Sequence, residues 1–283
     1  MPGNENLAGE LAELTCGNVG RLRVRRFPDG ESYIRVESDV KHRDVSVVCT
    51  LARPDPQFLP LAYAAEALRQ SGAKRVNLIA PYLAYMRQDR IFHPGEVQAS
   101  RAFAELLQQH FDWLVTVDPH LHRHANLDEV YDIPTTVVHA GPLFAQWIVT
   151  HVKSAVVVGP DDESTQWVEE IAREADVPWT VFAKERRGDR QVRMTAPDLS
   201  KFRGRTPVLV DDIVSSGVTV RRAIAILRQQ DFKTPYCLAV HALCSAATAS
   251  HISNCTAGFV TSNSVPNRNA RLNVAPIIAA ATA

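Results

Sequence analysis

Short apolar runs alternate with amphipathic segments along most of the chain. An apolar run of about four to eight residues between turn residues indicates a buried strand, whereas apolar residues at every third or fourth position indicate a helix. These patterns predict strands at Val45–Leu51, Val76–Pro81, Trp113–Val117, Ala155–Val158, Trp179–Phe182, Pro207–Val210, Tyr236–Ala242 and Gly258–Val260. They predict helices at Leu59–Gln70, Gln98–His110, Ser164–Ala175 and Thr219–Gln229.

The alternation of strands and helices predicts an α/β fold. Strands joined through helices form mostly parallel sheets that are flanked by helices on both faces. Two sets of strands predict two similar halves, which divide near His139–Pro142, where a Gly-Pro pair interrupts the pattern. A length of 283 residues fits two domains, since domains usually hold about 100–200 residues. The expected domains are residues 1–140 and 141–283.

Composition narrows the classes of function. The 31 basic residues balance the 31 acidic residues, which argues against nucleic acid as a partner, because that binding needs a basic surface. The five cysteines form no Cys-x-x-Cys pair, which favours a reduced compartment. The N-terminus lacks the pattern of a signal peptide, and no apolar run reaches the roughly 18 residues of a membrane span. We therefore expect a cytoplasmic protein without a membrane partner.

The segment Val208–Val220 carries the clearest chemical pattern. Four apolar residues lead into Asp211 and Asp212, and small hydroxyl residues with a glycine then precede a helix. Backbone N–H groups at a helix N-terminus bind phosphate, and paired carboxylates accept hydrogen bonds from vicinal hydroxyls. This combination predicts a site for a ribose phosphate. The alternative is a plain turn in which Ser216 caps the helix, but paired acids at the end of a buried strand are costly without a role.

Two loops in the first half carry polar residues whose role is open on the residues alone. Asp29, Gly30 and Glu31 follow a basic segment and Pro28, a pattern that also describes a simple turn. Arg87 and Gln88 follow a predicted strand, where a guanidinium group suits phosphate oxygens and an amide suits a base edge. A solvated charged loop is the alternative for this second segment.

Strand ends also supply candidate metal ligands. Asp161 follows a predicted strand and is a natural magnesium anchor, although it also fits the cap of the next helix. His120 begins a histidine-rich run with His122 and His124. The run has no cysteine nearby and no second pair at zinc-site spacing, so exposed or hydrogen-bonded histidines are the alternative to a metal site.

Lys184 and Arg186 follow the strand Trp179–Phe182, in a polar segment that extends to Met194. This segment is typical of a mobile lid that carries cations over an active site. A solvated basic loop is the alternative.

The motif Val208–Val220 resembles the phosphoribosyl diphosphate (PRPP) binding motif shared by phosphoribosyltransferases and PRPP synthetases. The remaining motifs separate these two families, because they resemble ribose-phosphate pyrophosphokinase, which is PRPP synthetase. The segments that carry this resemblance are Gly3–Ala12, Arg25–Val36, Ala80–Arg90, Val115–His124, Gly159–Ser164, Ala183–Arg187 and Leu272–Ala281.

The resemblance implies a reaction in which the ribose 1-hydroxyl attacks the β-phosphorus of MgATP, giving PRPP and AMP. It implies ATP and ribose 5-phosphate as partners, Mg²⁺ as cofactor, and a homo-oligomer, either a dimer or a hexamer. The implied catalytic residues are Lys184 and Arg186, and the implied metal contacts are His120 and Asp161. The implied ATP-binding residues are Asp29, Gly30, Glu31, Arg87 and Gln88. The implied ribose 5-phosphate residues are Arg186, Asp211, Asp212, Ser215, Ser216, Gly217, Val218 and Thr219.

Departures from the family pattern keep other functions open. Many bacterial members have Asp, Thr and Gly where this chain has Ser215, Ser216 and Val218. Because a valine does not easily adopt a positive φ, we expect Gly217 to supply the bend of this loop. The alternatives are a phosphoribosyltransferase that consumes PRPP, a non-catalytic regulatory subunit, and a kinase acting on a related phosphorylated ribose.

Overall fold

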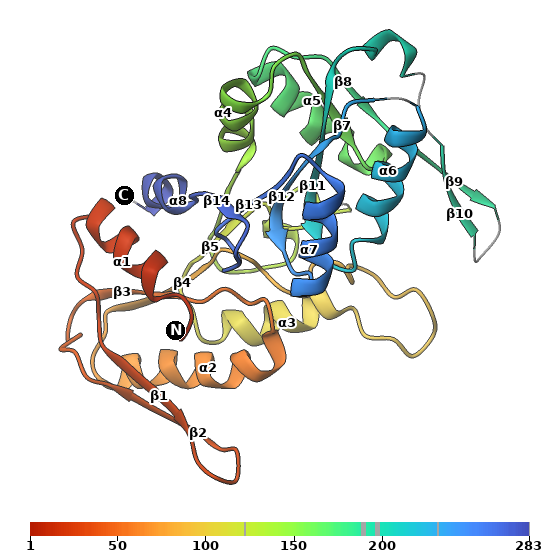
Figure 1. Ribbon diagram of the computed structural model, residues 1–283. Coiled ribbons are helices and arrows are strands. Elements are labelled where there is room, and N and C mark those ends of the chain that lie inside the picture. The colour runs from red at the N-terminus through yellow and green to blue at the C-terminus, as the bar shows by residue number, and fades with distance from the viewer. Residues whose placement is uncertain (122, 188–190, 196–198, 231, 283) are drawn as a thin grey trace. The chain divides into compact units, whose positions relative to one another are not determined.

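The computed structural model describes residues 1–121, 123–187, 191–195, 199–230 and 232–282. The chain forms two compact units (Figure 1). The first comprises Met1–His139, Ser264–Pro266 and Val274–Ala283, and the second comprises Ala140–Asn263 and Asn267–Asn273. The last helix therefore belongs to the first unit. The division into functional domains 1–140 and 141–283 stays a prediction.

The first unit is built on a four-stranded parallel sheet with the strand order β3-β4-β5-β6. The strands are β3 (Asp44–Val48), β4 (Arg75–Ala80), β5 (Leu114–Val117) and β6 (Thr135–Val138). The helices are α1 (Glu5–Leu14), α2 (Pro54–Gln70), α3 (Ala99–Gln108) and α8 (Ala275–Thr282), and a short 3₁₀ turn, η1, spans Leu127–Glu129. Helix α8 packs against α1 and contacts β5 and β6, which joins the C-terminal end of the chain to the first unit.

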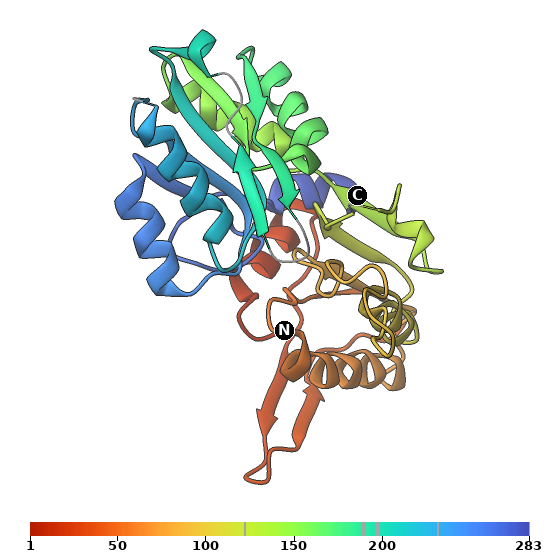
Figure 2. The same cartoon turned by 90° about the vertical axis from the view of Figure 1, so that its right-hand side faces the viewer.

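An antiparallel hairpin precedes this sheet and projects beyond α2 (Figure 2). It consists of β1 (Leu22–Arg26) and β2 (Ser32–Val36). We did not predict these strands, because they contain no continuous apolar run; Leu22 and Val24 instead alternate with exposed arginines, which is the pattern of a half-buried strand. Helix α2 also begins earlier than the predicted Leu59. Pro60 lacks the N–H group that normally bonds the carbonyl of Pro56, and Arg26 of the hairpin donates to that carbonyl instead, at 3.2 Å.

The second unit is built on a six-stranded, wholly parallel sheet with the order β14-β13-β12-β11-β7-β8. The strands are β7 (Ala155–Gly159), β8 (Trp179–Val181), β11 (Thr206–Val214), β12 (Tyr236–Ala242), β13 (Gly258–Ser262) and β14 (Ala270–Leu272). The helices are α4 (Gly141–His151), α5 (Thr165–Glu174), α6 (Val218–Gln229) and α7 (Ala246–Cys255), with 3₁₀ turns η2 (Asp162–Ser164) and η3 (Ser200–Phe202). Buried residues of the central strands and of α6, including Leu209, Ala239 and Leu227, form the core of this unit.

The two parallel sheets confirm the α/β class predicted from the alternation of strands and helices. Strand β12 has the predicted bounds, whereas β11 is longer than the predicted Pro207–Val210. The strand continues because Asp211, Ile213 and Val214 keep their parallel pairing with β12. Among the residues described, no helix is both long and apolar enough to cross a membrane.

Candidate functional site

The loop between β11 and α6 forms the sharp turn that the sequence predicted. Gly217 has a φ of +71° and is the N-cap residue of α6. Gly217 therefore supplies the bend, and Val218 begins the helix. Ser216 does not cap the helix as the alternative proposed; its Oγ accepts only a weak hydrogen bond from the Val218 N–H, at 3.5 Å. The first N–H groups of a helix lack intrahelical partners, so this turn offers several donors to an anion.

Arg221 adds a positive charge beside this loop. Its Nε donates to the carbonyl of Gly217 at 3.3 Å, and its backbone N–H donates to the same oxygen at 3.0 Å. The motif-based prediction does not include Arg221. The available signal was its spacing, because a side chain four residues after an N-cap points back toward the start of the helix.

Asp211 and Asp212 lie inside β11 rather than after it. Burial of the Asp211 carboxyl, the charge of Asp212 and a hydrogen bond to Asp212 together raise the pKa of Asp211 well above its usual value. The charge of Asp161 adds to this effect. Asp212 accepts a hydrogen bond from the Ile213 N–H at 2.7 Å. A carboxyl whose pKa is raised in this way is able to donate a hydrogen bond as well as to accept one, so the pair suits neighbouring hydroxyls.

Asp161 is buried, with 8% of its surface exposed, directly after β7. Its Oδ1 accepts from the Glu163 N–H at 3.1 Å and caps η2, so the helix-cap alternative is partly realised in this short turn rather than at α5. Gly159 allows the chain to pass close to Ser164 here, because a Cβ at position 159 would lie 2.2 Å from the Ser164 Oγ. Within the described part of the chain, no group of three or more His, Cys, Asp or Glu side chains forms a metal cage.

Lys184 and Arg186 belong to β9 (Ala183–Arg187), which pairs antiparallel with β10 (Gln191–Thr195). In the register of the pair, Lys184 is opposite Met194 and Arg186 is opposite Val192. The predicted lid therefore has a hairpin backbone at its base. Its residues 188–190 lie outside the described residues, and the mobility of the segment stays a prediction.

In the first unit, Asp29, Gly30 and Glu31 form the turn of the hairpin β1–β2. Gly30 has a φ of +95°, and the Glu31 N–H donates to Asp29 Oδ1 at 3.1 Å. All three residues are exposed. The guanidinium of Arg25 lies 4.3 Å from each ring centre of Phe27 and Tyr33, which stiffens the base of the turn.

Arg87 and Gln88 lie in the loop between β4 and α3. Arg87 is exposed and Gln88 is half-buried. The Gln88 N–H donates to the carbonyl of Tyr85 at 3.3 Å, and the Gln88 carbonyl accepts from the Ser100 N–H at 3.2 Å. Tyr85 itself has a φ of +63°, and its hydroxyl bonds Asp55. Hydrogen bonds to Tyr85 and Ser100 thus fix the backbone of the loop at Gln88, one of the two residues predicted to bind ATP.

His120 follows β5, beside a buried and strained aspartate. Asp118 has a φ of +34° and an exposed fraction of 8%, and its Oδ1 lies 2.8 Å from Nδ1 of His139 at the end of β6. Sequence reasoning assigned no role to Asp118 or His139; the signal for Asp118 was its place at a strand end, as for Asp161. Nδ1 of His124 lies 3.0 Å from Oε2 of Glu129. His122 lies outside the described residues.

The structure brings the predicted residues together in two sets, one in each unit. The loops that carry Arg87, Gln88 and His120 follow the neighbouring parallel strands β4 and β5, and the hairpin turn belongs to the same unit. Asp161, Asp211 and Asp212 lie close enough for their charges to interact in the second unit.

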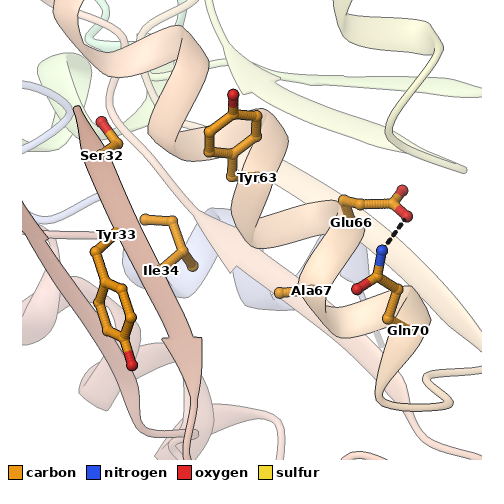
Figure 3. Close-up of a pocket in the computed structure, with 7 residues that line it drawn as sticks. All are labelled: Ser32, Tyr33, Ile34, Tyr63, Glu66, Ala67 and Gln70. Carbon is orange, nitrogen blue, oxygen red and sulfur yellow. Dashed lines mark hydrogen bonds between the residues drawn. The ribbon is translucent and has the colours of Figure 1, made fainter.

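A pocket of about 300 Å³ in the first unit contains none of the predicted residues. It lies between β2 and α2 (Figure 3), where Gln70 Nε2 donates to Glu66 Oε1 at 2.8 Å. The residues that line it are Ser32, Tyr33, Ile34, Tyr63, Glu66, Ala67 and Gln70.

Comparison with known proteins first defines the class. Residues 126–266 match the family described as the phosphoribosyl transferase domain, and residues 1–110 match the N-terminal domain of ribose phosphate pyrophosphokinase. The crystal structure of phosphoribosylpyrophosphate synthetase from Mycobacterium smegmatis is similar to this chain with a TM-score of 0.85 and 26% identity, covering 98% of this chain and 94% of that one. The two units therefore have the phosphoribosyltransferase type of α/β fold.

Curated relatives then define the family. The ribose-phosphate pyrophosphokinase of Methanopyrus kandleri is 33% identical over 97% of this chain and 94% of its own length. The ribose-phosphate pyrophosphokinase of Thermoplasma acidophilum is 31% identical over 86% of this chain and 83% of its own length. The chain belongs to the ribose-phosphate pyrophosphokinase family, which confirms the resemblance stated from its motifs.

Proposed function

We propose that this protein transfers the β,γ-diphosphoryl group of MgATP to the 1-hydroxyl of ribose 5-phosphate, giving PRPP and AMP, with the residues described above. The observation that carries this proposal is the path from β11 through Asp211, Asp212 and Gly217 into α6, in a chain whose relatives match it nearly end to end. A phosphoribosyltransferase would share this path, but residues 1–110 belong to the synthetase family.

The turn at Gly217 holds the 5-phosphate of the sugar. The N–H groups at the start of α6 donate to the phosphate oxygens, and the hydroxyls of Ser215, Ser216 and Thr219 supply further donors. Asp211 and Asp212 bind the ribose hydroxyls, because paired carboxyl groups accept hydrogen bonds from vicinal hydroxyls. Ser215 carries no charge where many bacterial members have an aspartate, which favours the approach of a dianion.

The first unit binds the nucleotide. Arg87 donates to phosphate oxygens, Gln88 pairs with a base edge, and Asp29 and Glu31 at the exposed hairpin turn accept hydrogen bonds from the nucleoside. The contacts of the Gln88 backbone reduce the freedom of this loop before ATP arrives, which lowers the entropic cost of binding.

Asp161 and His120 suit a magnesium ion that arrives bound to ATP. Mg²⁺ usually keeps several waters and binds one or two carboxylates together with substrate phosphates, so an all-protein cage is not required. Asp161 would hold the ion in the second unit, where burial and the charges of Asp212 and Asp161 raise the pKa of Asp211. His120 in the first unit would act through water or phosphate, because a direct imidazole bond to Mg²⁺ is unusual. When bound, the ion neutralises phosphate charge.

Lys184 and Arg186 stabilise the charge that develops on the transferred group. Phosphoryl-type transfer depends mostly on positioning and on neutralisation of oxygen charge, so cations on a lid are suited to this step. Arg186 also contacts ribose 5-phosphate.

One incubation separates this reaction from its rivals. The purified protein is mixed with ATP, Mg²⁺ and ribose 5-phosphate, and in parallel with PRPP and purine or pyrimidine bases. We expect AMP only in the first mixture. Nucleotide formation from PRPP and a base would indicate a phosphoribosyltransferase. The absence of turnover in both mixtures would favour a regulatory subunit.

We also expect a homo-oligomer, either a dimer or a hexamer, that acts in the cytoplasm. Apolar side chains such as Leu14, Leu59 and Tyr63 are about half exposed in the first unit, which suits contact with another copy. Light scattering coupled to size-exclusion chromatography tests this expectation, and a monomer at micromolar concentration would contradict it.

A further inference from the structure

Asp89 and Arg123 form an ion pair between two loops of the first unit. Arg123 Nη1 lies 2.8 Å from Asp89 Oδ1 and 2.9 Å from Oδ2, so one nitrogen donates to both carboxylate oxygens. The Asp89 side chain is 2% exposed, and the Arg123 side chain is 40% exposed. Asp89 is therefore buried beneath a cation that reaches it from another part of the chain, 34 residues away in sequence.

Asp89 stands next to the residues that we assign to ATP, but its side chain is unavailable to a ligand. Arg87 and Gln88 are more exposed than Asp89, which points into the protein. Its backbone carbonyl is held as well, because Gln98 Nε2 donates to it at 2.7 Å. A buried carboxylate without its cation is strongly unfavourable, so the position of Arg123 is coupled to that of Asp89.

Arg123 comes from the loop that follows β5, three residues after His120. Two guanidinium groups lie near the ring of Phe92, in the loop after β4: that of Arg90 is 4.7 Å from the ring centre and that of Arg123 is 5.9 Å away. Arg123 thus contacts the first loop at two places. The two loops follow the adjacent parallel strands β4 and β5, so the ion pair joins loops that leave the same edge of the sheet.

We propose that Arg123 is a positioning residue for the nucleotide: its ion pair with Asp89 sets the spacing between Arg87 and Gln88 on one loop and His120 on the other. This inference rests on the proposed function, because it assumes that these three residues receive MgATP. Groups that orient ligand-binding residues typically change affinity or activity by about 10- to 100-fold when removed.

The test uses the full chain with Arg123→Met, Arg123→Lys and Asp89→Asn. Arg101→Met is the matched control, since Arg101 of α3 also reaches the loop after β5, at the Glu129 carbonyl (3.3 Å), but from outside the ion pair. We expect Arg123→Met to raise the KM for MgATP by about 10-fold or more and to leave the KM for ribose 5-phosphate unchanged. Arg123→Lys, which keeps the charge, should restore part of the loss, and Arg101→Met should resemble the wild type.

Two results would overturn the inference. One is a wild-type KM for MgATP in Arg123→Met, with or without a lower melting temperature, because a purely structural ion pair affects stability alone. The other is an equal rise in the KM of both substrates. The double variant Asp89→Asn with Arg123→Met keeps the test valid if single variants unfold, because it leaves no unpaired buried charge. Failure of the proposed function is distinct, since the wild type would then form no AMP.

Discussion

Gly217 and Thr248 lie so close together that no side chain fits between them. A Cβ on Gly217 would lie 2.7 Å from Cγ2 of Thr248, and the φ of Gly217 is +71°. Thr248 belongs to α7, whose N-cap Ser245 accepts from the Thr248 N–H. The loop proposed to bind ribose 5-phosphate is thus pressed against a neighbouring helix, and a glycine is required there for two independent reasons.

Gly217→Ala should destabilise the protein by about 2–5 kcal/mol, the sum of the costs of a left-handed residue with a Cβ and of an overpacked contact. It should also weaken ribose 5-phosphate binding, since the turn must shift. Chemical denaturation and calorimetric titration measure the two effects.

The control is Gly204→Ala. Gly204 also has a positive φ, of +83°, but a Cβ there would meet no atom within 4 Å, so the expected cost is only about 1–2 kcal/mol. Thr248→Ser removes the clashing methyl and keeps the hydroxyl, so it should recover part of the Gly217→Ala loss. Equal costs at Gly217 and Gly204 would show that the contact with Thr248 is unimportant.

Asp211→Asn should stabilise the free protein at neutral pH but not near pH 4. The pKa of Asp211 is raised in the folded state by burial and by Asp212, so the folded protein binds this proton more tightly than the unfolded chain. Wild-type stability is therefore lost as the pH rises from about 4, the pKa of an unfolded aspartate, toward the folded pKa. The amide of asparagine mimics the protonated carboxyl and avoids that loss.

Melting temperatures of both proteins between pH 4 and pH 8 check this expectation. The difference in favour of Asp211→Asn should grow with pH. A constant difference, or one that shrinks as the pH rises, would mean that Asp211 is ionised in the folded protein.

Lys184→Ala should cut turnover by about 10²- to 10³-fold while ribose 5-phosphate binding stays largely intact. The reason is that a cation acting on developing charge matters in the transition state more than in the ground state. Steady-state kinetics and direct titration with ribose 5-phosphate separate the two quantities. Lys153→Ala, an exposed lysine before β7, serves as the control. Near-normal turnover in Lys184→Ala would remove the lid from the mechanism.

The sequence predicts the fold best for the strands that are buried along their whole length. Tyr236–Ala242 is an apolar run between turn residues, and it forms a central strand with those bounds. The strand predictions were wrong where polar or charged residues interrupt the apolar runs. Asp211 and Asp212 seemed to end β11, yet pairing with β12 carries the strand through Val214. The hairpin β1–β2 was missed because its apolar residues alternate with polar ones and form no continuous apolar run.

The site was predictable to the extent that its residues are close in sequence. Gly217 could be assigned the bend because Val218 resists a positive φ, a local rule. The pairs Asp89–Arg123 and Asp118–His139 could not be found in this way. Each pair joins two loops that become neighbours only when the parallel strands align. The two residues of a pair are far apart in sequence, and no sequence pattern relates one to the other.

The nature of the transferred group is the most direct test of this account. Phosphorus-31 NMR of the protein with ATP, Mg²⁺ and ribose 5-phosphate distinguishes transfer of a diphosphoryl group from transfer of a single phosphoryl group. The proposed reaction gives equal amounts of AMP and of a ribose 5-phosphate that carries a diphosphate on C1. Formation of ADP with a single phosphate on C1, or no change in the ATP signals, would contradict it.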